Sequence, residues 1–226
     1  MKAAVVTFPG SNCDEDTVIA LERLGVEPVR RWYKDTDLGG AEWVILPGGF
    51  SYGDYLRSGA LAARAPIMDA VEQLVARDQL HVLGICNGFQ ILCERGLLPG
   101  ALRANRDGKF RCTWEGVRVA SAPSAWPGFQ VGQSFRLPIA HREGAFTVSE
   151  QELDRLFQEG TVFLQYCDRE GRVVDEAANP NGSMGAVAGL ARGRVMGLMP
   201  HPERAVSQFL GSEDGLEFLR LWLQGR

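Results

Sequence analysis

Long apolar runs are missing from this sequence, and so is any excess of basic residues. No stretch approaches the roughly 18 consecutive apolar residues that indicate a membrane helix. Lys and Arg number 24 against 28 Asp and Glu, which gives a formal net charge of −4. The basic surface that is typical of nucleic-acid binding is therefore absent. We expect neither a membrane nor a nucleic acid among the partners of this protein.

The five cysteines are scattered and lack the spacing of a disulfide framework. Because no Cys-x-x-Cys pair is present, we expect no metal site. The apolar stretch at residues 2–8 is too short for the core of a signal peptide. The sequence consequently predicts a cytoplasmic protein.

What the sequence does contain is an ordinary globular composition, 45% hydrophobic and 23% charged. A chain of 226 residues forms one domain or two. Since we find no linker, internal repeat or low-complexity segment, we expect residues 1–226 to form a single domain. The 27 glycines favour a fold with frequent tight turns between strands and helices.

Short apolar runs alternate with amphipathic segments over the first hundred residues. The runs predict buried strands, and the amphipathic segments predict helices. The predicted strands are residues 2–8, 26–32, 41–46 and 81–85. A first helix is predicted to end near residue 24, and two more are predicted at 66–78 and 86–94. This alternation indicates an α/β fold with a mostly parallel central sheet and helices on both faces.

The signals are weaker in the middle of the chain, where only residues 135–140 clearly resemble a strand before residue 141. Further along, the predicted strands are 161–166, 186–190 and 194–199, the predicted helices are 149–158 and 212–224, and a turn is predicted at 178–183. We therefore expect an antiparallel region added to the parallel sheet.

A nucleophile elbow with Cys in place of Ser is predicted at Gly84-Ile85-Cys86-Asn87-Gly88-Phe89-Gln90, between a strand and a helix. The glycines would allow a sharp turn that lifts the Cys86 sulfur above the edge of the sheet. The start of the helix favours a thiolate, and the N–H of Asn87 would stabilise an oxyanion. The alternative is an inert, buried Cys86 at a strand–helix turn.

His201 stands between two prolines in Met199-Pro200-His201-Pro202-Glu203-Arg204. The residue before a proline is extended, and residues i and i+2 of an extended chain point to the same side. Glu203 could therefore orient the ring of His201. A His that is oriented by a carboxylate and faces a Cys is the general form of an activated nucleophile. The alternative is a turn His beside a surface Glu.

Two glycines follow another predicted strand, in Leu46-Pro47-Gly48-Gly49. Ligands of open α/β sheets bind beyond the carboxyl ends of the strands, and glycine lets backbone N–H groups approach them. The N–H of Gly49 could thus be a second oxyanion donor. Of the other histidines, His141 could line or support the site, whereas His81 is expected to be structural.

These motifs resemble the triad glutamine amidotransferases, and the chain as a whole resembles one family among them, the glutaminase subunits of phosphoribosylformylglycinamidine synthase. Four more stretches carry the resemblance: residues 8–14, 48–57, 179–183 and 199–204. The resemblance implies a flavodoxin-like fold. One departure is Arg142, where that family usually has a small residue.

The resemblance implies that glutamine is hydrolysed to glutamate and ammonia. We assign Cys86, His201 and Glu203 to the catalytic triad, Gly49 and Asn87 to the oxyanion hole, and Gln90 and His141 to substrate binding. The ammonia would pass to a large synthetase subunit that makes formylglycinamidine ribonucleotide, in a complex that also holds a small accessory subunit. No cofactor is expected in this chain, whereas ATP and magnesium are expected on the synthetase.

Two other functions stay open at this point. One is a different amidotransferase subunit or a γ-glutamyl hydrolase of the same fold, and the other is a flavodoxin-like binding module with an inert Cys86. The loop Phe50–Arg57 would favour the multi-subunit function if its aromatic residues dock a partner. Alternatively, Tyr52 and Tyr55 pack on the core of this chain.

Overall fold

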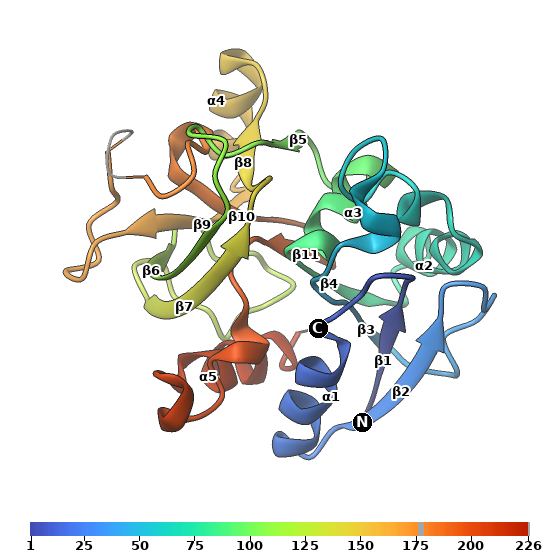
Figure 1. The fold of residues 1–226 in the computed structure, drawn as a ribbon. Helices are drawn as coiled ribbons and strands as arrows, with labels where there is room; N and C mark the ends of the chain where they lie inside the picture. Colours follow the sequence, from blue (N-terminus) through green and yellow to red (C-terminus); the bar gives the residue numbers. More distant parts are fainter. Residues whose placement is uncertain (176–178, 226) are drawn as a thin grey trace. The chain divides into compact units, whose positions relative to one another are not determined.

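The computed structural model describes residues 1–175 and 179–225. The chain forms two compact units (Figure 1). Unit 1 comprises Met1–Pro99 and Arg194–Gly197, and unit 2 comprises Gly100–Gly193 and Leu198–Arg226. The single domain expected from the sequence stays a prediction.

Unit 1 is a parallel α/β layer. Its strands are β1 (Lys2–Thr7), β2 (Glu27–Trp32), β3 (Trp43–Leu46), β4 (His81–Ile85) and most of β11 (Val195–Leu198), whose last residue belongs to unit 2. Its helices are α1 (Asp14–Arg23), α2 (Pro66–Ala76) and α3 (Asn87–Arg95). The strand order β2-β1-β3-β4 is parallel throughout. The N–H of Val82 in β4 donates to the carbonyl of Arg194, just before β11. The predicted parallel sheet is confirmed.

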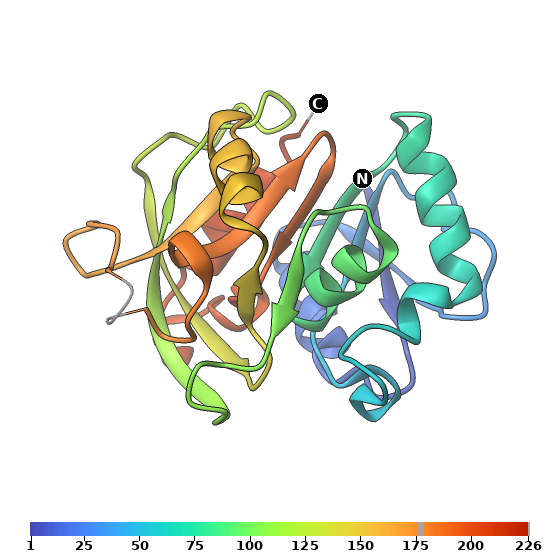
Figure 2. The ribbon, with the colours of Figure 1, turned by 90° about the horizontal axis from the view of Figure 1, so that it is seen from above.

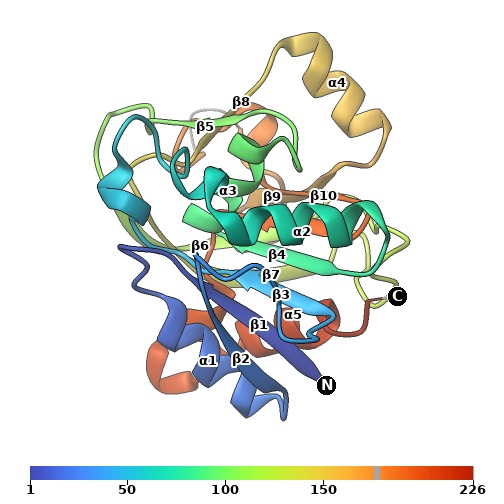
Figure 3. The same cartoon turned by 90° about the vertical axis from the view of Figure 1, so that its right-hand side faces the viewer.

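Helices cover both faces of this sheet, which is why β3 and β4 are buried along their whole length. In Figure 3, α1 lies on one side of the strands and α2 and α3 lie on the other. Arg95 at the end of α3 forms ion pairs with Asp69 and Glu72 of α2. These contacts hold the two helices together beside the strand that leads to Cys86.

Unit 2 is mostly antiparallel (Figure 2). Its strands are β5 (Ala101–Arg103), β6 (Arg111–Val119), β7 (Ser134–His141), β8 (Ala145–Thr147), β9 (Val162–Cys167) and β10 (Val187–Arg192), and its helices are α4 (Glu150–Gln158) and α5 (Asp214–Trp222). The antiparallel order is β10-β9-β6-β7, and β5 pairs separately with β8. The predicted antiparallel region is thus confirmed, although β5, β6 and β8 were not among the predicted strands.

A cluster of aromatic rings forms the core between α5 and the antiparallel strands. The rings belong to Phe129, Phe135, Phe163 and Phe218, with neighbouring centroids 5.0–6.3 Å apart. Ser149 caps α4, because its Oγ accepts the N–H of Glu152 at 3.2 Å. Short 3₁₀ helices occur at Ser51–Asp54, Ala62–Arg64, Met184–Ala186, Pro202–Arg204 and Gln208–Leu210.

In residues 1–175 and 179–225, none of the helices combines the length and the apolar character that crossing a bilayer requires. The predicted turn at 178–183 begins at Ala178, which lies outside the described residues. Its remainder, from Asn179 onward, contacts the loop that follows β7.

Candidate active site

Cys86 occupies the tight turn between β4 and α3. Its backbone torsions are φ 51° and ψ −103°, an unusual conformation for a residue other than glycine. Such strained torsions gather at functional sites because the surrounding structure enforces them. The side chain thus sits at the N-terminus of α3, where the helix dipole favours negative charge.

The flanking glycines have a different role from the one expected. The strained torsion falls on Cys86, whereas Gly84 and Gly88 do not adopt positive φ. A Cβ at Gly88 would lie 1.9 Å from the carbonyl oxygen of Leu46, and one at Gly84 would lie 2.6 Å from the backbone of Gly88. These glycines therefore let α3 pack directly against β3 and β4, and they do not form the turn itself.

The side chain of Asn87 connects two parts of the predicted site. Its Oδ1 accepts the N–H of Ser51 at 3.3 Å, and its Nδ2 donates to Oε1 of Gln90 at 2.9 Å. Asn87 and Gln90 are both buried. The loop that follows β3 is thereby tied to the residue next to Cys86, and the Gln90 amide is held in a defined orientation.

Gly49 lies in that loop with φ 151°. Within the described part of the chain, its N–H has no hydrogen-bond acceptor. The N–H groups of the first turn of a helix also lack intrahelical acceptors, and Asn87 is the first residue of α3. Gly49 and Asn87 thus offer backbone N–H donors in two segments, and the hydrogen bond between Ser51 and Asn87 joins these segments.

In unit 2, His201 and Glu203 form a buried pair. Their Nδ1 and Oε1 atoms are 2.6 Å apart, and both residues are 1% exposed. The contact is present, but the extended chain invoked from the sequence is not its cause, since Glu203 lies in the 3₁₀ helix Pro202–Arg204. A carboxylate only accepts hydrogen bonds, so Nδ1 of His201 donates to Glu203.

His141 ends β7 and is held by Asn105. The Oδ1 of Asn105 accepts from Gly144 N–H at 3.2 Å and lies 3.1 Å from Nδ1 of His141. Nδ1 therefore donates, which leaves Nε2 as an acceptor. Within the described residues, no donor reaches this buried Nε2. Burial, and then the nearby His201, lower the pKa of His141 to about 3, so its ring is neutral.

The turn that begins at Asn179 braces the loop after His141. Asn181 Nδ2 and Ser183 Oγ both donate to the carbonyl of Gly144, at 2.8 and 3.2 Å. Gly144 packs on the His141 ring so closely that a Cβ there would lie 2.3 Å from it. No physical role for Asn105 or Asn181 could be inferred from the sequence, because their partners are distant along the chain.

The structure thus groups the predicted site residues by unit. Gly49, Cys86, Asn87 and Gln90 lie in unit 1, and His141, His201 and Glu203 lie in unit 2. His81 stacks on Trp43 in unit 1 with 4.1 Å between ring centroids, as a structural residue would. None of the five cysteines forms a disulfide bond.

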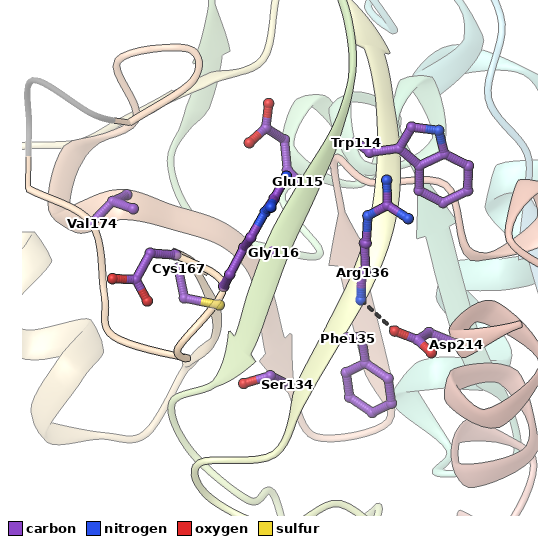
Figure 4. Close-up of a pocket in the computed structure, with 11 residues that line it drawn as sticks. Trp114, Glu115, Gly116, Ser134, Phe135, Arg136, Cys167, Val174 and Asp214 are labelled. Atoms are coloured by element: carbon purple, nitrogen blue, oxygen red, sulfur yellow. Dashed lines mark hydrogen bonds between the residues drawn. The ribbon is translucent and has the colours of Figure 1, made fainter. Parts of the chain in front are cut away.

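A separate cavity of about 840 Å³ opens on the antiparallel strands of unit 2 (Figure 4). Its rim holds Arg136, whose guanidinium lies over the ring of Trp114 and whose backbone N–H donates to Asp214 at 2.6 Å. The sulfur of Cys167 lines the wall, and burial raises the pKa of that thiol. None of the site residues assigned from the sequence lines this cavity, so it is separate from the candidate active site.

Comparison with known proteins identifies the class first. The family model of the CobB/CobQ-like glutamine amidotransferase domain matches residues 1–214. Two relatives named phosphoribosylformylglycinamidine synthase subunit PurQ are each 50% identical to this chain. The match to the protein from Methanosarcina acetivorans covers 95% of this chain and 94% of the relative. The match to the protein from Rubrobacter xylanophilus covers 100% of this chain and 99% of the relative. The chain therefore belongs to the glutamine amidotransferase family, in the branch formed by the PurQ subunits.

Solved structures agree with this assignment. A chain in the structure of PurLQS from Thermotoga maritima is 42% identical, with a TM-score of 0.84 over 98% of this chain and 97% of that one. A putative GMP synthase component from Thermoplasma acidophilum is 14% identical, with a TM-score of 0.62 over 99% and 92%. This second likeness concerns the fold alone.

Proposed function

We propose that this chain is the glutaminase subunit of a phosphoribosylformylglycinamidine synthase. It hydrolyses glutamine to glutamate and ammonia. The ammonia passes to a synthetase subunit that converts formylglycinamide ribonucleotide to formylglycinamidine ribonucleotide in purine synthesis. The observation that carries the chemistry is the strained Cys86 at the start of α3, and the PurQ relatives support the choice of reaction.

In the first step, His201 takes the proton of the Cys86 thiol, and Sγ of Cys86 attacks the side-chain amide carbon of glutamine. The carbonyl oxygen becomes an oxyanion and accepts from the N–H groups of Gly49 and Asn87. Removing one such donor typically raises the barrier by about 3 to 4 kcal/mol. Support for this role comes from the Gly49 N–H, which has no acceptor in the described residues.

In the second step, the tetrahedral intermediate collapses. His201 protonates the leaving nitrogen, so ammonia departs and a Cys86 thioester remains. His201 then takes a proton from water, and the water oxygen attacks the thioester to release glutamate and the thiol. Glu203 holds the ring and stabilises its cation, which the 2.6 Å contact supports. This mechanism uses Cys86 of unit 1 and His201 and Glu203 of unit 2.

Two further residues bind the substrate in this proposal. Gln90 contributes a side-chain amide that Asn87 already orients. His141 presents the neutral Nε2 acceptor, which suits an N–H donor of glutamine. The contacts of Asn105 and Gly144 hold this ring in place.

The expected partners are a large synthetase and a small accessory protein of the same complex, by analogy with the PurLQS structure. ATP and magnesium belong to the synthetase in this proposal, and this chain needs no cofactor of its own. We place the protein in the cytoplasm, and the lack of disulfide bonds among its five cysteines suits such a reducing compartment.

The test measures glutamate release and nucleotide product in the complex reconstituted with the synthetase and the accessory subunit. Cys86→Ala should abolish both when glutamine is the nitrogen source, and should leave synthesis from added ammonia intact. Substantial glutamine hydrolysis by Cys86→Ala would exclude the triad. A chain whose rate is already maximal without partners would favour the γ-glutamyl hydrolase, and a Cys86 inert to a glutamine-analogue alkylator would favour the binding module.

A further inference from the structure

Two loops of unit 1 bind each other through their backbones. The first, termed the β1 loop, is Phe8–Cys13, and the second, the β3 loop, is Gly48–Tyr52. Four hydrogen bonds join them: Asn12 N–H and Cys13 N–H to Gly48 O at 3.4 and 3.3 Å, Phe50 N–H to Gly10 O at 2.9 Å, and Tyr52 N–H to Pro9 O at 2.6 Å. Ser11 and Gly49 face each other in an antiparallel bridge.

This pairing fixes the orientation of one peptide group. The carbonyl of Gly48 receives two N–H donors from the β1 loop. In a trans peptide, the following N–H points away from that carbonyl. The N–H of Gly49 is therefore directed away from the β1 loop, and in the described part of the chain it is left without an acceptor.

Close approach of the two loops depends on glycine at both contact points. A Cβ at Gly49 would lie 2.7 Å from Cα of Ser11, and a Cβ at Gly10 would lie 2.3 Å from the carbonyl oxygen of Phe50. The β1 loop also has a turn of its own, since Ser11 N–H donates to Phe8 O at 2.9 Å and Ser11 Oγ accepts Phe8 N–H at 3.0 Å. It is thus a formed surface against which the β3 loop is aligned.

We propose that the β1 loop is the positioning element of the oxyanion donor at Gly49. It acts by holding the Gly48–Gly49 peptide through the hydrogen bonds to the Gly48 carbonyl and from the Phe50 N–H. The contact of Ser51 with Asn87 keeps the same loop beside the elbow. This inference rests on the proposed glutaminase function. Because an oxyanion exists only in the transition state and the intermediate, loss of the alignment should lower kcat and leave KM for glutamine nearly unchanged.

The test uses Gly10→Ala in the reconstituted complex, because the new methyl group must push the Phe50 carbonyl away. Gly25→Ala is the matched control, since Gly25 also has a positive φ, 71°, but no heavy atom within 4 Å of its Cβ position. We expect kcat of Gly10→Ala to fall about 10²–10³-fold. Gly25→Ala should retain the kcat of the parent.

Two reagents distinguish a misplaced Gly49 N–H from a general disruption of the active site. Glutamate γ-semialdehyde adds reversibly to Cys86: the thiol proton passes to His201, and the aldehyde oxygen becomes an alkoxide that needs the oxyanion donors. Iodoacetamide alkylates the thiol without them. In Gly10→Ala, semialdehyde affinity should fall together with kcat, whereas the rate of iodoacetamide labelling should match the parent.

A Gly10→Ala complex with parental kcat and semialdehyde affinity would overturn the inference. If Gly10→Ala does not fold, Ser11→Ala decides, because it removes only the hydroxyl that accepts from Phe8 and should lower kcat and semialdehyde affinity roughly 2- to 10-fold. Unchanged values for Ser11→Ala would then overturn the inference. A parent complex that releases no glutamate would instead refute the proposed function, and the inference with it.

Discussion

The rings of His201 and His81 are both buried, yet they contact different partners. His201 binds the Glu203 carboxylate, whereas His81 stacks on Trp43. His201→Asn should lower kcat for glutamine hydrolysis by about 10²–10⁴-fold, because the general acid and base is lost. His81→Asn removes a ring that stacks on Trp43 outside the proposed site, and it should leave kcat nearly unchanged. Steady-state glutamate release by both variants checks this, and equal losses would indicate a folding defect.

His141 makes the stability of the fold depend on pH. Its pKa in the folded chain is about 3, against an ordinary value of 6.5. Below about pH 6.5 the unfolded chain takes up a proton at this residue and the folded chain does not, so the free energy of unfolding falls as the pH is lowered. This loss approaches about 1.4 kcal/mol per pH unit and stops once the folded His141 also titrates, near pH 3.

His141→Gln should therefore flatten the acid side of the stability profile. The variant loses one group that takes up a proton on unfolding, so its free energy of unfolding should fall less steeply than that of the parent between about pH 6 and about pH 4. Urea unfolding of both chains over this range provides the measurement. Parallel profiles would mean that His141 is protonated in the folded chain.

At the scale of whole elements, the approach of α3 to β3 is the tightest requirement in unit 1. Gly88→Ala would place a Cβ 1.9 Å from the carbonyl of Leu46, so the helix must shift. We expect a loss of about 1 to 3 kcal/mol in the free energy of unfolding, together with lower activity because Cys86 and Gln90 flank the contact. Gly96→Ala is the control, since Gly96 has open space around its Cβ position, although its φ is positive. Equal urea stability of the two variants would contradict this account.

Strands could be predicted from the sequence where their residues are buried. β3 and β4 are buried on every residue and appeared as clear apolar runs. β6 could not be predicted, because residues 111–113 are exposed and only Val117 and Val119 are fully buried. β5 and β8 form a separate pair of three-residue strands, too short to leave a periodic pattern.

The candidate site could also be predicted only in part. The elbow around Cys86 and the pair of His201 and Glu203 are local motifs, so the sequence alone located them. The brace of His141 by Asn105 joins residues 36 positions apart, and no local pattern reports such a contact. The strained torsion of Cys86 was likewise assigned to its neighbouring glycines, because sequence shows which residues permit a turn and not which residue forms it.

At the scale of the whole molecule, the loop Phe50–Arg57 is the part of unit 1 best suited to meet a partner. Tyr55 and Leu56 are 75% and 84% exposed. Tyr52, by contrast, packs edge-on against Tyr33 of this chain with 5.7 Å between centroids, and docking stays a prediction for the exposed Tyr55. Tyr52, Asp54 and Leu56 all have positive φ, which costs about 1 to 3 kcal/mol at each residue. A strained segment that exposes apolar side chains is typical of a docking site.

Tyr55→Ala should therefore weaken association with the proposed synthetase without changing the rate of the isolated chain. Loss of an interface anchor typically costs more than about 1 kcal/mol, so the synthetase concentration for half-maximal activation should rise about tenfold. Phe209→Ala is the matched control, because Phe209 is a fully exposed aromatic residue of unit 2. Titration of each variant with the synthetase and its accessory protein gives the answer. If Phe209→Ala weakens activation and Tyr55→Ala does not, the synthetase docks on unit 2 and the exposed loop of unit 1 has another role.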